Sequence, residues 1–145
     1  MHDLPRQLSA EELAELFEGR TTLVERLAEH HDPLGSADEV IAGLSEADKL
    51  EALNAHPAIG SRRLSARSAA EQGTEDDPDI LAELDRLNRE YEQRFGFRFV
   101  VFVNRRPKSE IVPILRERLR RARDVELDTA LRELVAIARD RWEHS

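Results

Sequence analysis

The chain has 145 residues, of which 40% are apolar and 36% charged, the balance of a globular protein that buries its own core. It contains no cysteine, which excludes a disulfide scaffold, a thiolate zinc site and a cysteine nucleophile, and which fits a reducing cytosol. Its 22 basic and 30 acidic residues give a net charge of −8, which opposes non-specific binding of nucleic acid.

The hydropathy of the chain predicts a single cytoplasmic domain. No apolar run reaches the roughly 18–20 residues that a membrane span needs, and no secretory signal is visible. No internal repeat, low-complexity tract or long linker divides the chain. We therefore expect one domain over residues 1–145, without a membrane partner.

Helix-start signals dominate the first third of the chain. Ser9 is followed by Glu12 in a capping box, which predicts that a helix begins there. Ser36 and Glu39 form a second box, which predicts a short helix after a loop. The apolar residues that follow each box recur at helical spacing, so both helices are expected to bury one face.

The helical pattern breaks at His56. Because Pro57 bars the residue before it from helical geometry, His56 is expected at a helix end or in the turn after it. In the next predicted helix, Ser68, Glu71 and Gln72 stand at positions i, i+3 and i+4. This spacing places a hydroxyl, a carboxylate and an amide on one face, which suits the binding of a small polar molecule.

His56 and Glu71 are the candidate acid–base residues. An imidazole titrates near neutral pH, and a carboxylate that is partly buried beside it has its charge balance shifted. Position and spacing alone also fit a structural histidine and an ordinary solvated helix face, so they do not decide between the two interpretations.

The second half of the chain contains an unusual connection. Asp77 caps a predicted helix with Pro78 at its first position, and an apolar stripe runs on to Phe95. The following stretch is dense in aromatic and β-branched residues and is locally typical of a strand. No second strand is predicted, so we expect an all-α bundle with an extended buried segment near residues 97–104, whose amides need partners such as a ligand.

A basic run follows this segment. Residues 104–123 contain eight basic and two acidic residues, a local charge of +6. Such a run attracts an anion or forms a solvated helix face. Ser109 is placed to cap the helix that carries most of it, and Asp124 is placed to cap the last helix.

Motifs for metal and phosphate chemistry are absent from the sequence. His30 and His31 are adjacent, so on a helix their side chains diverge by about 100° and do not face one ion. The chain has no glycine-rich phosphate loop, no G-x-S-x-G and no H-E-x-x-H. We expect no metal.

Three motifs in one order resemble the 2-oxo-4-hydroxy-4-carboxy-5-ureidoimidazoline (OHCU) decarboxylase family. They are HPAIG at 56–60, SAAEQ at 68–72 and YEQRFGFRFV at 91–100. The likeness covers nearly the whole chain. It implies an all-α homodimer that decarboxylates OHCU to (S)-allantoin, after urate oxidation and hydrolysis of 5-hydroxyisourate.

The resemblance also implies roles for individual residues. His56 corresponds to the catalytic histidine and Pro57 to its neighbour at the substrate, while Glu71 is expected to orient and polarise the ring. The remaining substrate contacts are implied for Ser68 and Gln72 and for the backbone of Phe99, Val100, Val101, Phe102 and Val103.

The implied reaction needs no cofactor. The conjugated ring of the substrate can accept the electrons that the lost CO2 leaves behind, which makes the enzyme a cofactor-independent carboxy-lyase. Arg98 departs from the family, which commonly has proline there, and adds a charge beside the binding segment. Two alternatives stay open: a decarboxylase of a related ureido acid, and a non-catalytic helical interaction module that uses the basic 104–123 segment.

Overall fold

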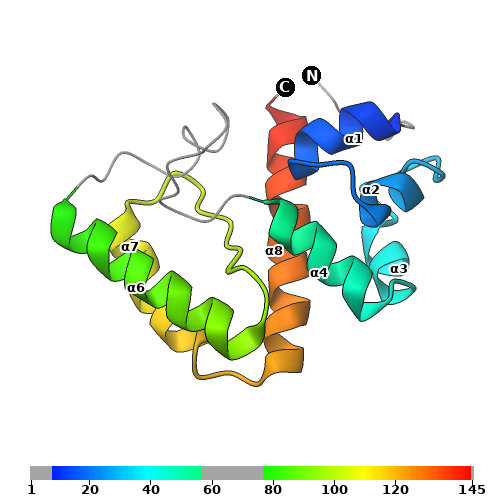
Figure 1. Ribbon diagram of the computed structural model, residues 1–145. Coiled ribbons are helices and arrows are strands. Elements are labelled where there is room, and N and C mark those ends of the chain that lie inside the picture. Colours follow the sequence, from blue (N-terminus) through cyan, green and yellow to red (C-terminus); the bar gives the residue numbers. More distant parts are fainter. Residues whose placement is uncertain (1–7, 57–76, 145) are drawn as a thin grey trace. The chain divides into compact units, whose positions relative to one another are not determined.

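The computed structural model describes residues 8–56 and 77–144, and within these residues the secondary structure is helical, with no strand (Figure 1). This confirms the predicted all-α fold. The described helices are α1 (Ala10–Phe17), α2 (Thr22–Leu27), α3 (Ala37–Ala42), α4 (Glu46–Ala55), α6 (Pro78–Phe95), α7 (Lys108–Arg118) and α8 (Arg123–Glu143).

The chain divides into two compact units. The first consists of residues 1–56 together with 131–145, and the second of residues 57–130. The first unit contains α1 to α4 and the C-terminal part of α8, and the second contains α6, α7 and the N-terminal part of α8. The single domain over residues 1–145 stays a prediction.

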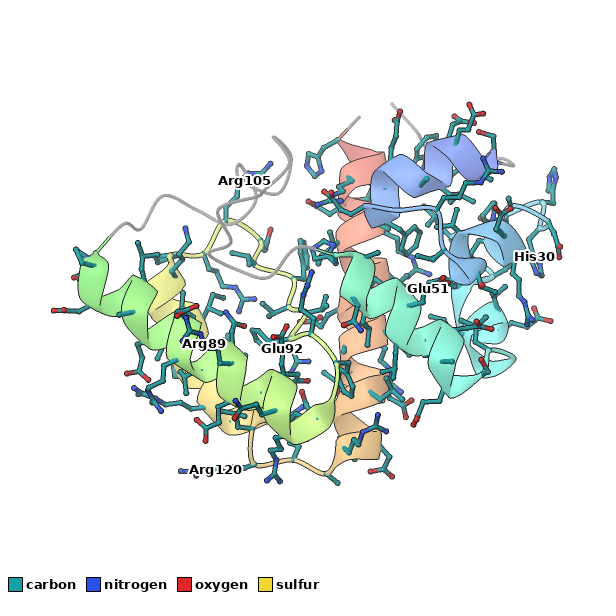
Figure 2. All side chains as sticks on the ribbon, viewed as in Figure 1. His30, Glu51, Arg89, Glu92, Arg105 and Arg120 are labelled. Carbon is teal, nitrogen blue, oxygen red and sulfur yellow. The ribbon has the colours of Figure 1, made fainter. Side chains whose placement is uncertain are left out.

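In the first unit α2 packs against α1, α3 and α4. Its residues Leu23, Val24 and Leu27 are fully buried, as the apolar spacing requires of a helix with neighbours on several sides. The backbone N–H of Thr22 donates to the Glu51 carboxylate on α4, 2.8 Å away (Figure 2). A side chain of one helix thus satisfies an orphan amide at the start of another.

In the second unit α6 packs against α7. The Asp77 carboxylate accepts from the N–H of Asp79, so the predicted cap of α6 is confirmed. Gly96 ends this helix with φ of +81°, in the left-handed region that favours glycine. The face of α6 that is turned inward consists of Leu84, Leu87, Asn88, Tyr91 and Phe95.

The connection from α6 to α7 contains the extended buried segment that was predicted to have no partner strand. Residues 97–103, called the 97–103 segment below, are neither helix nor strand (Figure 1). Their side chains are largely buried. The segment ends in a tight turn in which Asn104 and Arg105 have φ of 51° and 61°, and the N–H of Arg106 donates to the Val103 carbonyl at 3.0 Å.

Three predicted caps were wrong. Ser36 stands at the N-cap position of α3, but its φ of −95° and ψ of 4° lie outside the extended region that a cap needs, so its side chain makes no cap hydrogen bond and the predicted capping box is absent. Ser109 lies inside α7, since Pro107 adopts the extended cap geometry and the helix begins at Lys108. Asp124 lies in the first turn of α8.

Candidate active-site residues

His56 lies where its proline neighbour predicted. It ends α4 with extended backbone, φ −80° and ψ 136°, and its N–H donates to the Leu53 carbonyl at 3.2 Å. The residue is only 6% exposed. A helix end that is also buried holds the imidazole in a defined direction, which a solvated histidine does not have.

The predicted helical face falls outside the described part of the chain. This concerns Pro57 and the three residues Ser68, Glu71 and Gln72. Their roles, and the pairing of His56 with Glu71, stay predictions.

Arginine side chains hold three of the five carbonyls between Phe99 and Val103. The Val100 carbonyl accepts from Nη1 of Arg118 at 2.7 Å. The carbonyls of Phe102 and Val103 accept from the guanidinium of Arg106, at 2.6 and 2.8 Å. These bonds replace the ladder that a neighbouring strand would supply.

Val101 differs from these neighbours. It is 7% exposed, and within the described residues no hydrogen bond reaches its backbone N–H or C=O. Buried backbone groups are nearly always paired, so a partner outside this set is expected. A bound polar molecule is one such partner.

A buried charged network lies behind the 97–103 segment. Nε of Arg118 on α7 donates to Oε1 of Glu126 on α8 at 2.7 Å, and the same oxygen accepts from the hydroxyl of Tyr91 on α6 at 2.6 Å. The side chains of Arg118 and Glu126 are 4% and 0% exposed. The Arg118 guanidinium also lies over the ring of Phe99, 4.6 Å from its centroid.

Tyr91 connects this network to an aromatic cluster. Its ring lies 4.6 Å from that of Phe95, 5.9 Å from that of Phe97 and 5.2 Å from that of Phe99, measured between centroids. Burial, and then the hydrogen bond to Glu126, raise the pKa of the phenol well above its usual range. The hydroxyl therefore stays protonated and donates.

Arg98 is held at the rim of the segment. Its Nε lies 3.4 Å from Oε1 of Glu92 on α6, and its side chain is 32% exposed. This contact gives the charge of Arg98 a carboxylate partner.

Most basic side chains of the 104–123 segment bind carbonyls or carboxylates of their own unit. Arg106, Arg118 and Arg123 donate to backbone carbonyls, the last to that of Phe95 at 2.8 Å. Arg116 and Arg121 pair with carboxylates. Figure 2 shows Arg105 and Arg120 at the surface.

These findings weigh against the interaction module. A non-catalytic module would be expected to leave His56 exposed, whereas the residue is buried. The module also needed a basic surface, whereas the arginines of the 104–123 segment largely bind carbonyls and carboxylates of their own unit.

Sequence reasoning missed the Arg118–Glu126–Tyr91 network. In the sequence Arg118 is one member of the basic run, and Glu126 lies eight positions further along the chain, across a loop. One signal was present: Tyr91 stands on the buried stripe of α6, and a buried tyrosine usually needs a partner for its hydroxyl.

The described residues contain no cluster of histidine, aspartate and glutamate side chains that suits a metal ion. None of the described helices is both long and apolar enough to cross a bilayer.

Comparison with known proteins assigns the chain to a family. The OHCU decarboxylase family profile matches residues 2–143. The 2-oxo-4-hydroxy-4-carboxy-5-ureidoimidazoline decarboxylase of Haloferax volcanii is 32% identical over 143 residues, covering 86% of this chain and 80% of its own. The protein of the same name from Amia calva is 34% identical over 119 residues, covering 76% and 68%.

A solved structure shares the fold. A crystal structure of OHCU decarboxylase in the presence of (S)-allantoin superimposes with a TM-score of 0.75 at 24% identity, covering 90% of this chain and 94% of that one. Together with the profile match over nearly the full length, these likenesses establish that the chain belongs to the OHCU decarboxylase family.

Proposed function

We propose that this protein decarboxylates OHCU to (S)-allantoin and CO2 in urate degradation. The observation that carries the proposal is the family match over residues 2–143, with relatives of that activity at 32% and 34% identity. The cysteine-free composition is compatible with the reaction, because the chemistry needs no thiol.

The reaction depends on how the protein orients the substrate more than on any added reagent. The bond between the ring carbon and the carboxylate breaks, CO2 leaves, and the electron pair passes into the conjugated ring of the substrate. The hydroxyl on that carbon then loses its proton and becomes a carbonyl, while the neighbouring ring carbon that bears the ureido group takes a proton on one face, which sets the handedness of the product. The protein must align the carboxylate with the ring and deliver that proton from one side.

His56 is proposed as the acid–base residue at the hydroxyl-bearing carbon, beside Pro57. An imidazole exchanges protons near neutral pH, and the burial of His56 at the end of α4 suits a residue that must deliver a proton from one side. Glu71 is proposed to orient and polarise the ring, with Ser68 and Gln72 binding its polar groups.

The backbone from Phe99 to Val103 is proposed to hold the polar edges of the substrate. Val101 supports this proposal, because within the described residues its buried backbone makes no hydrogen bond. Arg106 and Arg118 already occupy the carbonyls of three neighbours. Substrate binding is therefore assigned chiefly to Val101.

The test of these roles is His56→Asn, assayed by the circular dichroism of (S)-allantoin formed from urate, urate oxidase and 5-hydroxyisourate hydrolase. We expect the variant to lose the stereospecific signal while it keeps its helical far-ultraviolet spectrum. His31→Asn is the matched control, because His31 is exposed and should retain full activity. A near-normal rate for His56→Asn would refute the assignment.

The family resemblance also leads us to propose a homodimer that works in the cytoplasm. The expected mass in solution is twice the 16.6 kDa of one chain. Sedimentation equilibrium measures this mass directly, and a single-chain mass at assay concentrations would exclude the dimer.

A further inference from the structure

The 97–103 segment lacks the usual means of fixing an extended backbone. In a sheet, ladders of hydrogen bonds set the register of each strand, and a slip by one residue exchanges the two faces. No strand lies beside this segment among the described residues. Its register therefore depends on the side chains that bind it.

Arg118 makes two contacts with consecutive residues of the segment. Its Nη1 donates to the Val100 carbonyl at 2.7 Å, and its guanidinium covers the ring of Phe99 at 4.6 Å. One contact fixes the direction of a peptide group and the other fixes the preceding side chain. A slip of the segment would break both at once.

The guanidinium is itself fixed from two other helices. Glu126 of α8 accepts from its Nε, and Tyr91 of α6 donates to the same carboxylate oxygen. The Tyr91 ring also contacts the edge of Phe99, so the phenylalanine is held between tyrosine and arginine. Side chains from α6 and α7 thus converge on Phe99, and Glu126 of α8 holds both of them.

The energetics of the buried Arg118–Glu126 pair favour a positioning role for Arg118 over a purely stabilising one. Removing two charges from water is costly, and apolar side chains of similar volume often stabilise a core equally well. The directional hydrogen bonds of a planar guanidinium instead specify where the bound group must lie.

We propose that Arg118 is a positioning residue for substrate binding. Held by Glu126 and Tyr91, it fixes Phe99 and Val100 so that the adjacent backbone of Val101 is presented to the substrate. The inference rests on the proposed function, since it explains how the segment assigned to the substrate keeps its conformation. Arg118 itself is not assigned a contact with the reacting atoms.

The test is Arg118→Lys, which keeps the charge but loses the planar fork that reaches Glu126 and Val100 together. We expect amide hydrogen exchange to accelerate in the 97–103 segment, while α6 and α7 keep their protection. KM should rise about tenfold with kcat changed by less than about twofold, because the segment binds edges of the substrate that do not react.

Arg116→Lys is the matched control, since Arg116 lies two residues away on the same helix and reaches Glu83 only at 3.6 Å near the surface. Its exchange, KM and kcat should equal those of the wild type. Unchanged exchange in the segment of Arg118→Lys would overturn the proposal. A fall in activity that merely follows the fraction of unfolded protein would also overturn it.

A second variant decides the question if Arg118→Lys does not fold. Tyr91→Phe removes only the hydroxyl that donates to Glu126, and it should raise exchange and KM in the same direction by a smaller factor. Wild-type values for Tyr91→Phe would overturn the proposal. If the wild-type protein does not decarboxylate OHCU, the proposed function fails, and the exchange data still decide whether Arg118 positions the segment.

Discussion

Tyr91 is the single tyrosine of the chain, so its ionisation can be followed without interference. Burial and the hydrogen bond to Glu126 raise its pKa in the folded protein. A raised pKa means that the folded state binds this proton more tightly than the unfolded chain does. The resulting stabilisation is complete below the unfolded pKa of about 10 and is lost as the pH rises further.

We therefore predict that tyrosinate absorbance does not develop in the folded protein when the pH passes about 10. It should appear only in step with the loss of helical circular dichroism at higher pH. The urea-unfolded chain is the control and should titrate normally. Tyrosinate absorbance that rises near pH ~10 while the helices stay intact would show that Tyr91 is not buried and bonded as described.

Arg98 offers a second test at the level of a single residue. Because its side chain is one-third exposed and pairs with Glu92 near the surface, Arg98→Ala should lower stability by less than about 1 kcal/mol. We expect kcat/KM for decarboxylation to stay near the wild-type value. A loss of activity at unchanged stability would instead assign Arg98 to the substrate carboxylate.

Helix α6 ends at a glycine in the left-handed region. Gly96 has φ of +81°, and a Cβ built there would meet no atom within 4 Å, so a substitution costs only backbone strain. Gly96→Ala should lower the free energy of unfolding by about 1–2 kcal/mol, and Gly96→Asn by less, because asparagine tolerates this region. Urea denaturation measures both, and equal stability of glycine and alanine would contradict the left-handed cap.

Local rules predicted most helices and failed where a preceding turn decided the geometry. Ser9 and Asp77 cap their helices as predicted, because both stand in extended or near-extended backbone before a helical run. Ser36 and Ser109 have suitable side chains but follow segments that already place them in or near helical backbone. Residue type alone does not reveal that conformation.

In the candidate site, too, the features set by local sequence were predicted and those set by the packing of helices were not. The position of His56 at a helix end follows from one rule about proline, and the 97–103 segment follows from a strand-like composition without a partner strand. The contacts of Arg118 with Phe99 and Val100 could not be predicted, because they depend on how α6, α7 and α8 pack. No spacing in the sequence encodes that packing.

For the molecule as a whole, the proposed reaction depends on the substrate's own ring as the electron acceptor. We therefore predict that dialysis against a strong chelator, followed by gel filtration, leaves the decarboxylation rate unchanged. Restoration of a lost rate by an added metal ion or organic cofactor would refute the cofactor-independent mechanism.

The activity proposed for this family member is the decarboxylation of OHCU. The most direct measurement is the time course of circular dichroism after urate is converted in place by urate oxidase and 5-hydroxyisourate hydrolase, with and without this protein. We predict that the protein accelerates the appearance of the (S)-allantoin signal in proportion to its concentration. A signal that develops at the spontaneous rate at every protein concentration would contradict the account.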